Sequence, residues 1–202
     1  MDDKKTIQTF EKFLGQSIID INYIETKFHY GASGDWTKAD PDLFVLHSPE
    51  WKMNFSNGEK WFLTNTHSGS TANKPARSII TVNSSSIAKH SDKTHKAPRS
   101  FGWNNILDKE ITAMRFYKRV TATKKILGVE TSKTYQDNIQ IIQLFCSDRS
   151  ISITTMNGDL GHMTFYPTGY FGDKLGLFFD KAVADSHSVF GQTMKMEMVY
   201  EA

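Results

Sequence analysis

Apolar and polar residues alternate with a period of two along much of this chain, and this alternation predicts mostly antiparallel β structure. The clearest example lies within residues 107–155. In an extended chain, Ile139, Ile141, Gln143 and Phe145 would lie on one side. Ile151 and Ile153 continue this period-two pattern after a polar turn at 147–150. This pattern predicts a β-hairpin with one buried face.

A second hairpin is predicted within residues 43–64. Tryptophan, methionine and phenylalanine alternate with polar residues at 51–56, and an aromatic and apolar return strand follows at 61–63. The pair Asn57-Gly58 lies between these two runs. Both residues readily adopt positive φ, so we expect them to form a two-residue hairpin turn.

The first residues of the chain have a different period. Over residues 3–14 the apolar positions recur at helical spacing, which predicts a short amphipathic helix that covers an apolar surface. Gly15 is the expected stop just beyond it. Residues 180–189 could form a second helix, capped by Asp180.

Several shorter runs predict further strands, at residues 18–30, 78–82, 160–166, 175–179 and 194–200. In the first of these, Ile19, Ile21 and Tyr23 are expected to share one face. Two polar connectors separate these runs, one over residues 67–99 and one after Val120. The tetrapeptide at 156–159 contains Asn-Gly and is read as a turn.

The second half of the chain repeats the pattern of the first. The spacing L-x-x-x-I-x-x-I-x-Y from Leu14 recurs from Leu107 as L-x-x-x-I-x-x-M-x-F, at an offset of 93 residues. With an offset of 90, four apolar positions of the hairpin within 43–64 fall on positions of the hairpin within 107–155. These are Trp51 on Ile141, Phe55 on Phe145, Trp61 on Ile151 and Leu63 on Ile153.

This repeat predicts an α+β fold, mostly antiparallel β, with two related β-meander halves packed together. The halves would be residues 1–100, with the N-terminal helix and a polar connector, and residues 101–202. Amphipathic strands resemble one another, so coincidence is the alternative to an internal duplication, and one compact domain is the alternative to two.

Composition describes an ordinary globular protein. The 202 residues are 39% hydrophobic and 12% aromatic, enough for a sizeable core. Cys146 is the single cysteine, so no internal disulfide can form. The N-terminus has no signal-peptide pattern, and no run approaches 18 apolar residues. We therefore expect a cytoplasmic protein that does not bind a membrane.

The net charge of +2 conceals two basic segments. Residues 66–100 and residues 115–133 each contain six Lys or Arg residues against one acidic residue. Basic segments can bind nucleic acid, so binding through residues 74–99 and 115–133 is an alternative function. Ordinary solvated connectors between strands would have the same composition.

Signatures of chemistry are weak. The seven histidines form no H-E-x-x-H, and one cysteine cannot form C-x-x-C, so we expect no metal and no cofactor. No nucleophile elbow or phosphate loop occurs, so no residue is assigned as catalytic. Cys146 ends an apolar strand and reads as a core residue. An uncharacterised hydrolase that uses His47 or His162 is a further alternative.

These features favour a non-enzymatic protein–protein binding module. One specific form would be a cytoplasmic immunity or inhibitor protein that neutralises a bacterial toxin or a similar partner. Aromatic loop residues and clustered charges are typical interface anchors. The candidate partner-binding residues are Asp35, Trp36, Asp40, Asp42, Trp103, Lys124 and Lys125.

Overall fold

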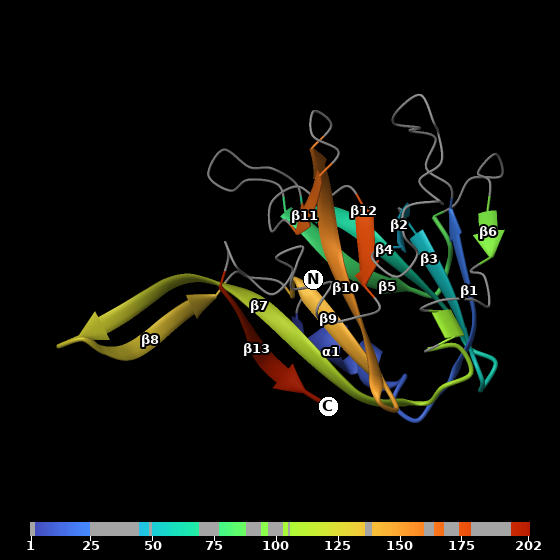
Figure 1. The fold of residues 1–202 in the computed structure, drawn as a ribbon, viewed down its shortest axis with the longest axis horizontal. Helices are drawn as coiled ribbons and strands as arrows, with labels where there is room; N and C mark the ends of the chain where they lie inside the picture. The colour runs from blue at the N-terminus through green and yellow to red at the C-terminus, as the bar shows by residue number, and fades with distance from the viewer. Residues whose placement is uncertain are drawn as a thin grey trace.

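The chain is described by a computed structural model that places most of the predicted elements. The residues described are 3–24, 45–48, 50–68, 77–87, 94–96, 103–104, 106–135, 139–159, 164–167, 174–178 and 195–202. Two mostly antiparallel sheets and one short helix account for most of them (Figure 1). The predicted α+β class, dominated by antiparallel strands, is confirmed at this level.

The first sheet has five strands in the order β5-β4-β3-β1-β6. Their bounds are β1 Ile18–Ile24, β3 Glu50–Phe55, β4 Lys60–Ser68, β5 Arg77–Asn83 and β6 Thr94–Lys96. The hairpin predicted within residues 43–64 is therefore present as β3 and β4, which pair through Trp51 and Leu63. The polar connector over 67–99 contains β5 and β6 as well as loops.

The second sheet has eight strands, of which six follow the order β13-β7-β9-β10-β12-β2, while β8 pairs with β7 and β11 with β10. Their bounds are β2 Val45–Ser48, β7 Ile111–Ile126, β8 Val129–Tyr135, β9 Ile141–Cys146, β10 Arg149–Asp159, β11 Thr164–Pro167, β12 Lys174–Phe178 and β13 Met196–Glu201. Strand β2 comes from the first half of the chain, so this sheet combines both halves.

Helix α1 (Asp3–Glu11) ends three residues before the predicted limit and leads into the core. Phe10 packs edge-to-face on Phe116 of β7, with ring centroids 6.0 Å apart, and Phe13 stacks on Phe55 of β3 at 4.5 Å. A single cluster of buried side chains draws on both sheets. The helix end therefore joins the two sheets through aromatic contacts.

One predicted face of β1 is wrong. The alternation grouped Ile19 with Ile21 and Tyr23, yet Ile19 is 41% exposed while Ile18 and Ile21 are fully buried. The pairing of β1 with β3 has a bulge between Ile18 and Asp20. A bulge inserts one extra residue, so the side chains before it change faces.

Two predicted turns also differ. Gly58 has φ 85°, but Asn57 is not among the residues with positive φ, and strand pairing stops at Asn54 and Lys60. The turn is therefore longer than two residues, with glycine alone in the left-handed region. Residues 156–159 are not a turn, because they continue β10 and pair with β11. The second helix considered at 180–189 lies outside the described residues.

Candidate protein-binding surface

The polar segment after Val120, predicted to be a connector, is a two-stranded β-ribbon. Strands β7 and β8 pair from Val120 and Tyr135 out to Ile126 and Val129. Residues 120–135, called the arm below, project from one end of the second sheet (Figure 1). The prediction of a connector was wrong because it looked for alternating apolar residues. A ribbon surrounded by solvent has no buried face and therefore lacks that alternation.

Local bonds replace a buried face in the arm. The Thr121 hydroxyl donates to the carbonyl of Thr134 over 3.0 Å, and the Thr131 hydroxyl donates to the carbonyl of Lys124 over 3.1 Å. Threonine and valine also favour extended backbone. These cross-strand bonds brace a ribbon that would otherwise be marginal.

The tip of the arm has an unusual turn. Ile126 pairs with Val129, and between them Leu127 and Gly128 have φ 50° and 81°. Two consecutive residues with positive φ are typical of a type I′ turn, which favours asparagine or glycine at both positions. A leucine there costs about 1–2 kcal/mol, because its Cβ approaches its own carbonyl.

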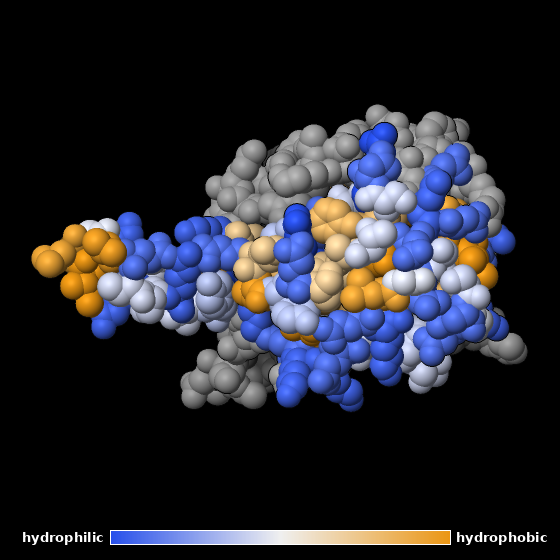
Figure 2. Space-filling view, turned by 90° about the horizontal axis from the view of Figure 1, so that it is seen from below, coloured by the Kyte–Doolittle hydropathy of each residue, from blue (hydrophilic) through white to orange (hydrophobic). Residues whose placement is uncertain are grey.

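This strained residue is also the most exposed apolar side chain described. Leu127 is 99% exposed, Val129 67% and Ile126 53%. In Figure 2 these apolar groups gather at the far end of the arm and are separated from the body by a polar stretch. Neither burial nor turn preference explains a leucine here, so the tip is a candidate contact site.

Two lysines lie immediately behind the tip. Lys124 and Lys125 are both exposed. Among the described residues, no carboxylate forms an ion pair with either of them. The distal arm therefore presents a small apolar end with two positive charges, those of Lys124 and Lys125, directly behind it.

The root of the arm is held by one carboxylate. Glu197 of β13 accepts from Lys133 Nζ over 2.6 Å, from the Tyr135 hydroxyl over 3.0 Å and from Lys195 Nζ over 3.1 Å. The hydrogen bond from Lys133, more than any other contact, lowers the pKa of Glu197 to about 2. The arm thus leaves the body at a defined position, because Lys133 and Tyr135 at its root both hydrogen-bond Glu197 of β13.

A groove of about 510 Å³ opens beside this root. It is lined by Asp3, Ile7, Lys118, Tyr135, Ile139, Met198, Val199 and Tyr200. Met198, Val199 and Tyr200 are substantially exposed, and Lys118 forms an ion pair with Asp3. Strand β13 is the last strand of the sheet order among the described strands. A groove with both apolar and polar lining next to a sheet edge suits protein contacts.

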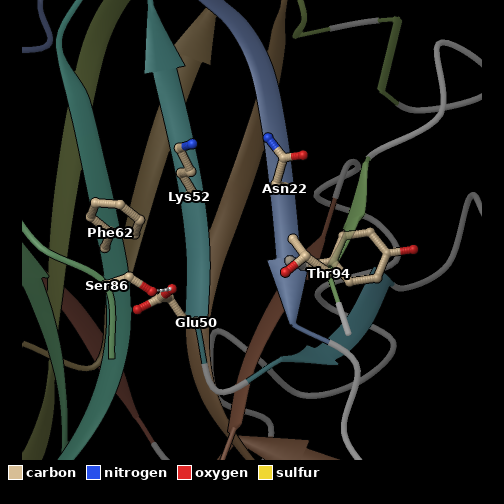
Figure 3. Close-up of a pocket in the computed structure, with 7 residues that line it drawn as sticks. Asn22, Glu50, Lys52, Phe62, Ser86 and Thr94 are labelled. Carbon is tan, nitrogen blue, oxygen red and sulfur yellow. Dashed lines mark hydrogen bonds between the residues drawn. The ribbon is translucent and has the colours of Figure 1, made fainter. Parts of the chain in front are cut away.

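A second cavity, of about 310 Å³, lies on the first sheet (Figure 3). Its lining includes Glu50, which is nearly fully buried and accepts hydrogen bonds from the Ser86 hydroxyl (2.5 Å) and the Ile87 amide (2.6 Å). Both carboxylate oxygens are therefore engaged with residues 86–87. In Figure 3, Lys52 and Asn22 extend from adjacent strands away from that carboxylate. Glu50 accordingly fastens residues 86–87 to β3.

The predicted site residues divide into three groups. Asp35, Trp36, Asp40 and Asp42 lie outside the described residues. Lys124 and Lys125 lie near the tip of the arm. Trp103 was expected on an exposed loop, but it is 1% exposed and packs against Trp51 with ring centroids 5.9 Å apart. Its indole belongs to the cluster of buried side chains that draws on both sheets.

The tip residues Ile126, Leu127 and Val129 were missed. Their signal in the sequence is K-K-I-L-G-V, an apolar turn in the middle of a threonine- and lysine-rich segment. Polar turns are the rule in hairpins, so an apolar residue beside a turn glycine could have marked the site.

The remaining candidate chemistry finds little geometric support. Burial raises the pKa of the Cys146 thiol to about 11, so it is a poor nucleophile. Within the described ranges, no group of three or more His, Cys, Asp or Glu side chains could hold a metal ion. His47 falls in β2, whereas His162 lies outside the described residues, so the hydrolase alternative remains a prediction.

None of the helices in the described part of the chain has the length and apolar character needed to cross a bilayer. Comparison of the chain with protein families, curated proteins and solved structures finds no match. The candidate function therefore rests on the geometry of the arm and the groove.

Proposed function

We propose that this chain is a non-enzymatic protein-binding module that uses the arm and the adjoining groove as its contact surface. The observation that carries this proposal is Leu127, which is strained in its turn and 99% exposed at the tip of a braced arm. An interface would bury this side chain, and burial of a leucine contributes about 1.5–3 kcal/mol.

The same surface has the composition of an interface. Exposed aromatic and apolar side chains at the groove, such as Tyr200 and Met198, resemble the anchors that contribute most binding energy. Lys124 and Lys125 would add electrostatic attraction at the rim. The narrower ideas, a cytoplasmic location and an immunity or inhibitor role against a bacterial toxin, are supported by composition alone.

Site-specific crosslinking tests the proposal. A Leu127→Cys variant carrying a benzophenone maleimide would be irradiated in an extract of the source organism. The native Cys146 should remain unlabelled, because it is buried and its pKa is raised to about 11. We expect a discrete crosslinked product, since the label lies at the proposed contact.

Ile87→Cys provides the matched control. Ile87 is 54% exposed but lies on the body, where its backbone N–H donates to the Glu50 carboxylate over 2.6 Å. The proposal predicts no discrete product from this position. If Leu127 and Ile87 labels give the same pattern, or if neither gives a product, the arm is not a binding site.

The nucleic-acid alternative is less well supported, because carboxylates from distant segments neutralise much of the basic stretch 115–133. Arg115 pairs with Glu201 over 2.7 Å, Lys118 pairs with Asp3, and Lys133 pairs with Glu197 over 2.6 Å. In the other stretch, 74–99, Lys96 pairs with Asp20 over 3.2 Å. Absence of binding to duplex or single-stranded oligonucleotides at low salt would exclude this alternative.

We also propose that the two halves of the chain, residues 1–100 and 101–202, are related by duplication. Several backbone features recur at the offset of 93. Phe13 N–H donates to Phe10 O over 2.8 Å, and Ile106 N–H donates to Trp103 O over 3.1 Å. These are equivalent positions in the two halves.

The contact between the halves is reciprocal at the same offset. Gly15 N–H donates to Ile111 O over 3.0 Å, and Asp108 N–H donates to Ile18 O over 2.8 Å. Both donor residues have positive φ, 74° and 61°. The bulge of β1 after Ile18 also has an equivalent in β7 after Ile111. The recurrence of these irregularities at matching positions supports duplication over coincidence.

Strand pairing changes the offset that relates β3 of the first half to β9 of the second half. Ile21 pairs with Met53, and its equivalent Met114 pairs with Leu144, which gives an offset of 91 there. Trp51 then corresponds to Ile142 and not to Ile141 as the spacing alone indicated. The buried faces of β3 and β9 coincide in this register.

A further inference from the structure

We propose that the partner of this surface is a second copy of this chain, with the arm tip of each protomer seated in the groove of the other. This inference rests on the proposed function, because it names the occupant of the same surface. Its starting point is that one molecule carries both an exposed apolar tip and a groove whose lining includes exposed apolar side chains.

The position of these two features permits reciprocal contact. The groove lies at the root of the arm and the apolar residues lie at its end, seven residues away from Val120 to Leu127. At about 3.4 Å per residue this is roughly 24 Å. Two arms placed side by side and antiparallel about a two-fold axis would bring each tip to the other root. A single two-fold axis therefore satisfies both contacts and closes the assembly.

The chemistry of the tip and the groove is compatible. Leu127 and Val129 would meet Ile7, Met198 and Val199, so apolar surface covers apolar surface. The charged groups that surround the groove are already paired within the chain, as in Lys118 with Asp3 and Lys133 with Glu197. They leave no large positive charge at the groove that would repel Lys124 and Lys125 of the other protomer.

The surface is also large enough. The arm and the groove residues together comprise about two dozen residues a side, and a standard interface uses about 20–30. The threonine-rich sides of the two arms would face each other along their length, where hydroxyl groups and water can satisfy polar contacts. An anionic lipid surface could attract the lysines and the tip, but it would leave the groove empty.

Sedimentation equilibrium of the purified full chain tests the inference. We expect a concentration-dependent mass that approaches twice 23.0 kDa. Leu127→Asp and Val199→Asp should each weaken dimerisation by about tenfold or more, because either charge would be buried in the contact. Ile87→Asp, at a position of the body that is 54% exposed, should leave the dimer unchanged. Circular dichroism would verify that all three variants are folded.

Disulfide trapping tests the reciprocal arrangement itself. Two differently tagged variants, Leu127→Cys and Val199→Cys, would be mixed and oxidised. A disulfide that joins the two tags is expected, because position 127 of one protomer would lie on position 199 of the other. Predominant products that join two copies of the same variant would overturn the arrangement.

The outcomes separate this inference from the proposed function. A chain that stays monomeric at the highest attainable concentration overturns the second-copy inference, whereas a heavier product from the Leu127 crosslinker would still support protein binding. Binding of the monomer to phosphatidylserine vesicles, lost in Leu127→Asp, would assign the tip to a lipid surface and overturn the inference. Absence of both association and crosslinking overturns the two together.

Discussion

The hydroxyl of Tyr135 donates a hydrogen bond to Glu197 over 3.0 Å, and this bond ties the last residue of the arm to strand β13. Lys133 reaches the same carboxylate from two residues earlier. A two-stranded ribbon without a core depends on such fixed points for its direction. The Glu197 carboxylate therefore couples the position of the arm to the edge of the second sheet.

The first prediction concerns this carboxylate and pH. The pKa of Glu197 is lowered from 4.5 to about 2, chiefly by the hydrogen bond from Lys133. Because the pKa is lower in the folded chain, the ionised form stabilises it above about pH 4.5, and this contribution is lost as pH falls through about 2. Wild type should have a higher Tm than Glu197→Gln at neutral pH, and the difference should vanish toward pH 2. A difference that does not change with pH would contradict this.

The second prediction concerns the turn at the tip. Asparagine adopts the left-handed region more readily than leucine, so Leu127→Asn should stabilise the arm by about 1 kcal/mol. Slower hydrogen exchange of the amides in residues 120–135 would measure this gain. The same variant should lose self-association, because the apolar anchor is gone. Unchanged association with a stabilised arm would show that Leu127 is not the anchor.

The third prediction separates the core position of Trp103 from the surface role expected from the sequence. Trp103 is buried against Trp51, so Trp103→Ala should lower the free energy of unfolding by about 3–5 kcal/mol. Ile87→Ala, at an exposed position, should change it by less than about 0.5 kcal/mol. Urea unfolding measures both. A small effect at Trp103 would mean that the indole is not part of the core.

The fourth prediction concerns the backbone where the two halves meet. Gly15 has φ 74°, and a Cβ placed there would meet no heavy atom within 4 Å. Gly15→Ala should therefore destabilise the chain by about 1 kcal/mol through backbone conformation alone. Gly15→Asn should cost less, as the aspartate at the equivalent position 108 suggests. Equal stability of Gly15→Ala and wild type, by urea unfolding, would contradict the assigned conformation.

Much of the sheet structure could be predicted from sequence because its signals are local. The alternation at 51–56 identified β3, and the spacing of Phe10 and Phe13 identified a helix with a buried face. The apolar run at 139–145 identified β9, but both faces of that strand are buried and not one as expected. Period-two and period-3.6 patterns describe which side chains share a face within one element. They do not describe which elements become neighbours.

The predictions failed where contacts between elements distant in sequence determine the structure. The bulge after Ile18 depends on pairing with β3, and it reversed the face assigned to Ile19. Strand β2 lies between β1 and β3 in sequence, yet it pairs with β12 at the edge of the second sheet. Trp103 lies in an irregular segment, so only the packing of Trp51 against it places the ring in the core.

The sequence by itself determined an antiparallel β protein with a short helix, an inert cysteine and two segments of similar pattern. Only the tertiary structure decided that the polar stretch after Val120 is a projecting arm with Leu127 at its tip. The physical reason is that an arm lacks a buried face, so its sequence has no periodic apolar pattern that predicts it. Its direction comes from Lys133 and Tyr135 meeting Glu197, residues more than sixty positions away along the chain.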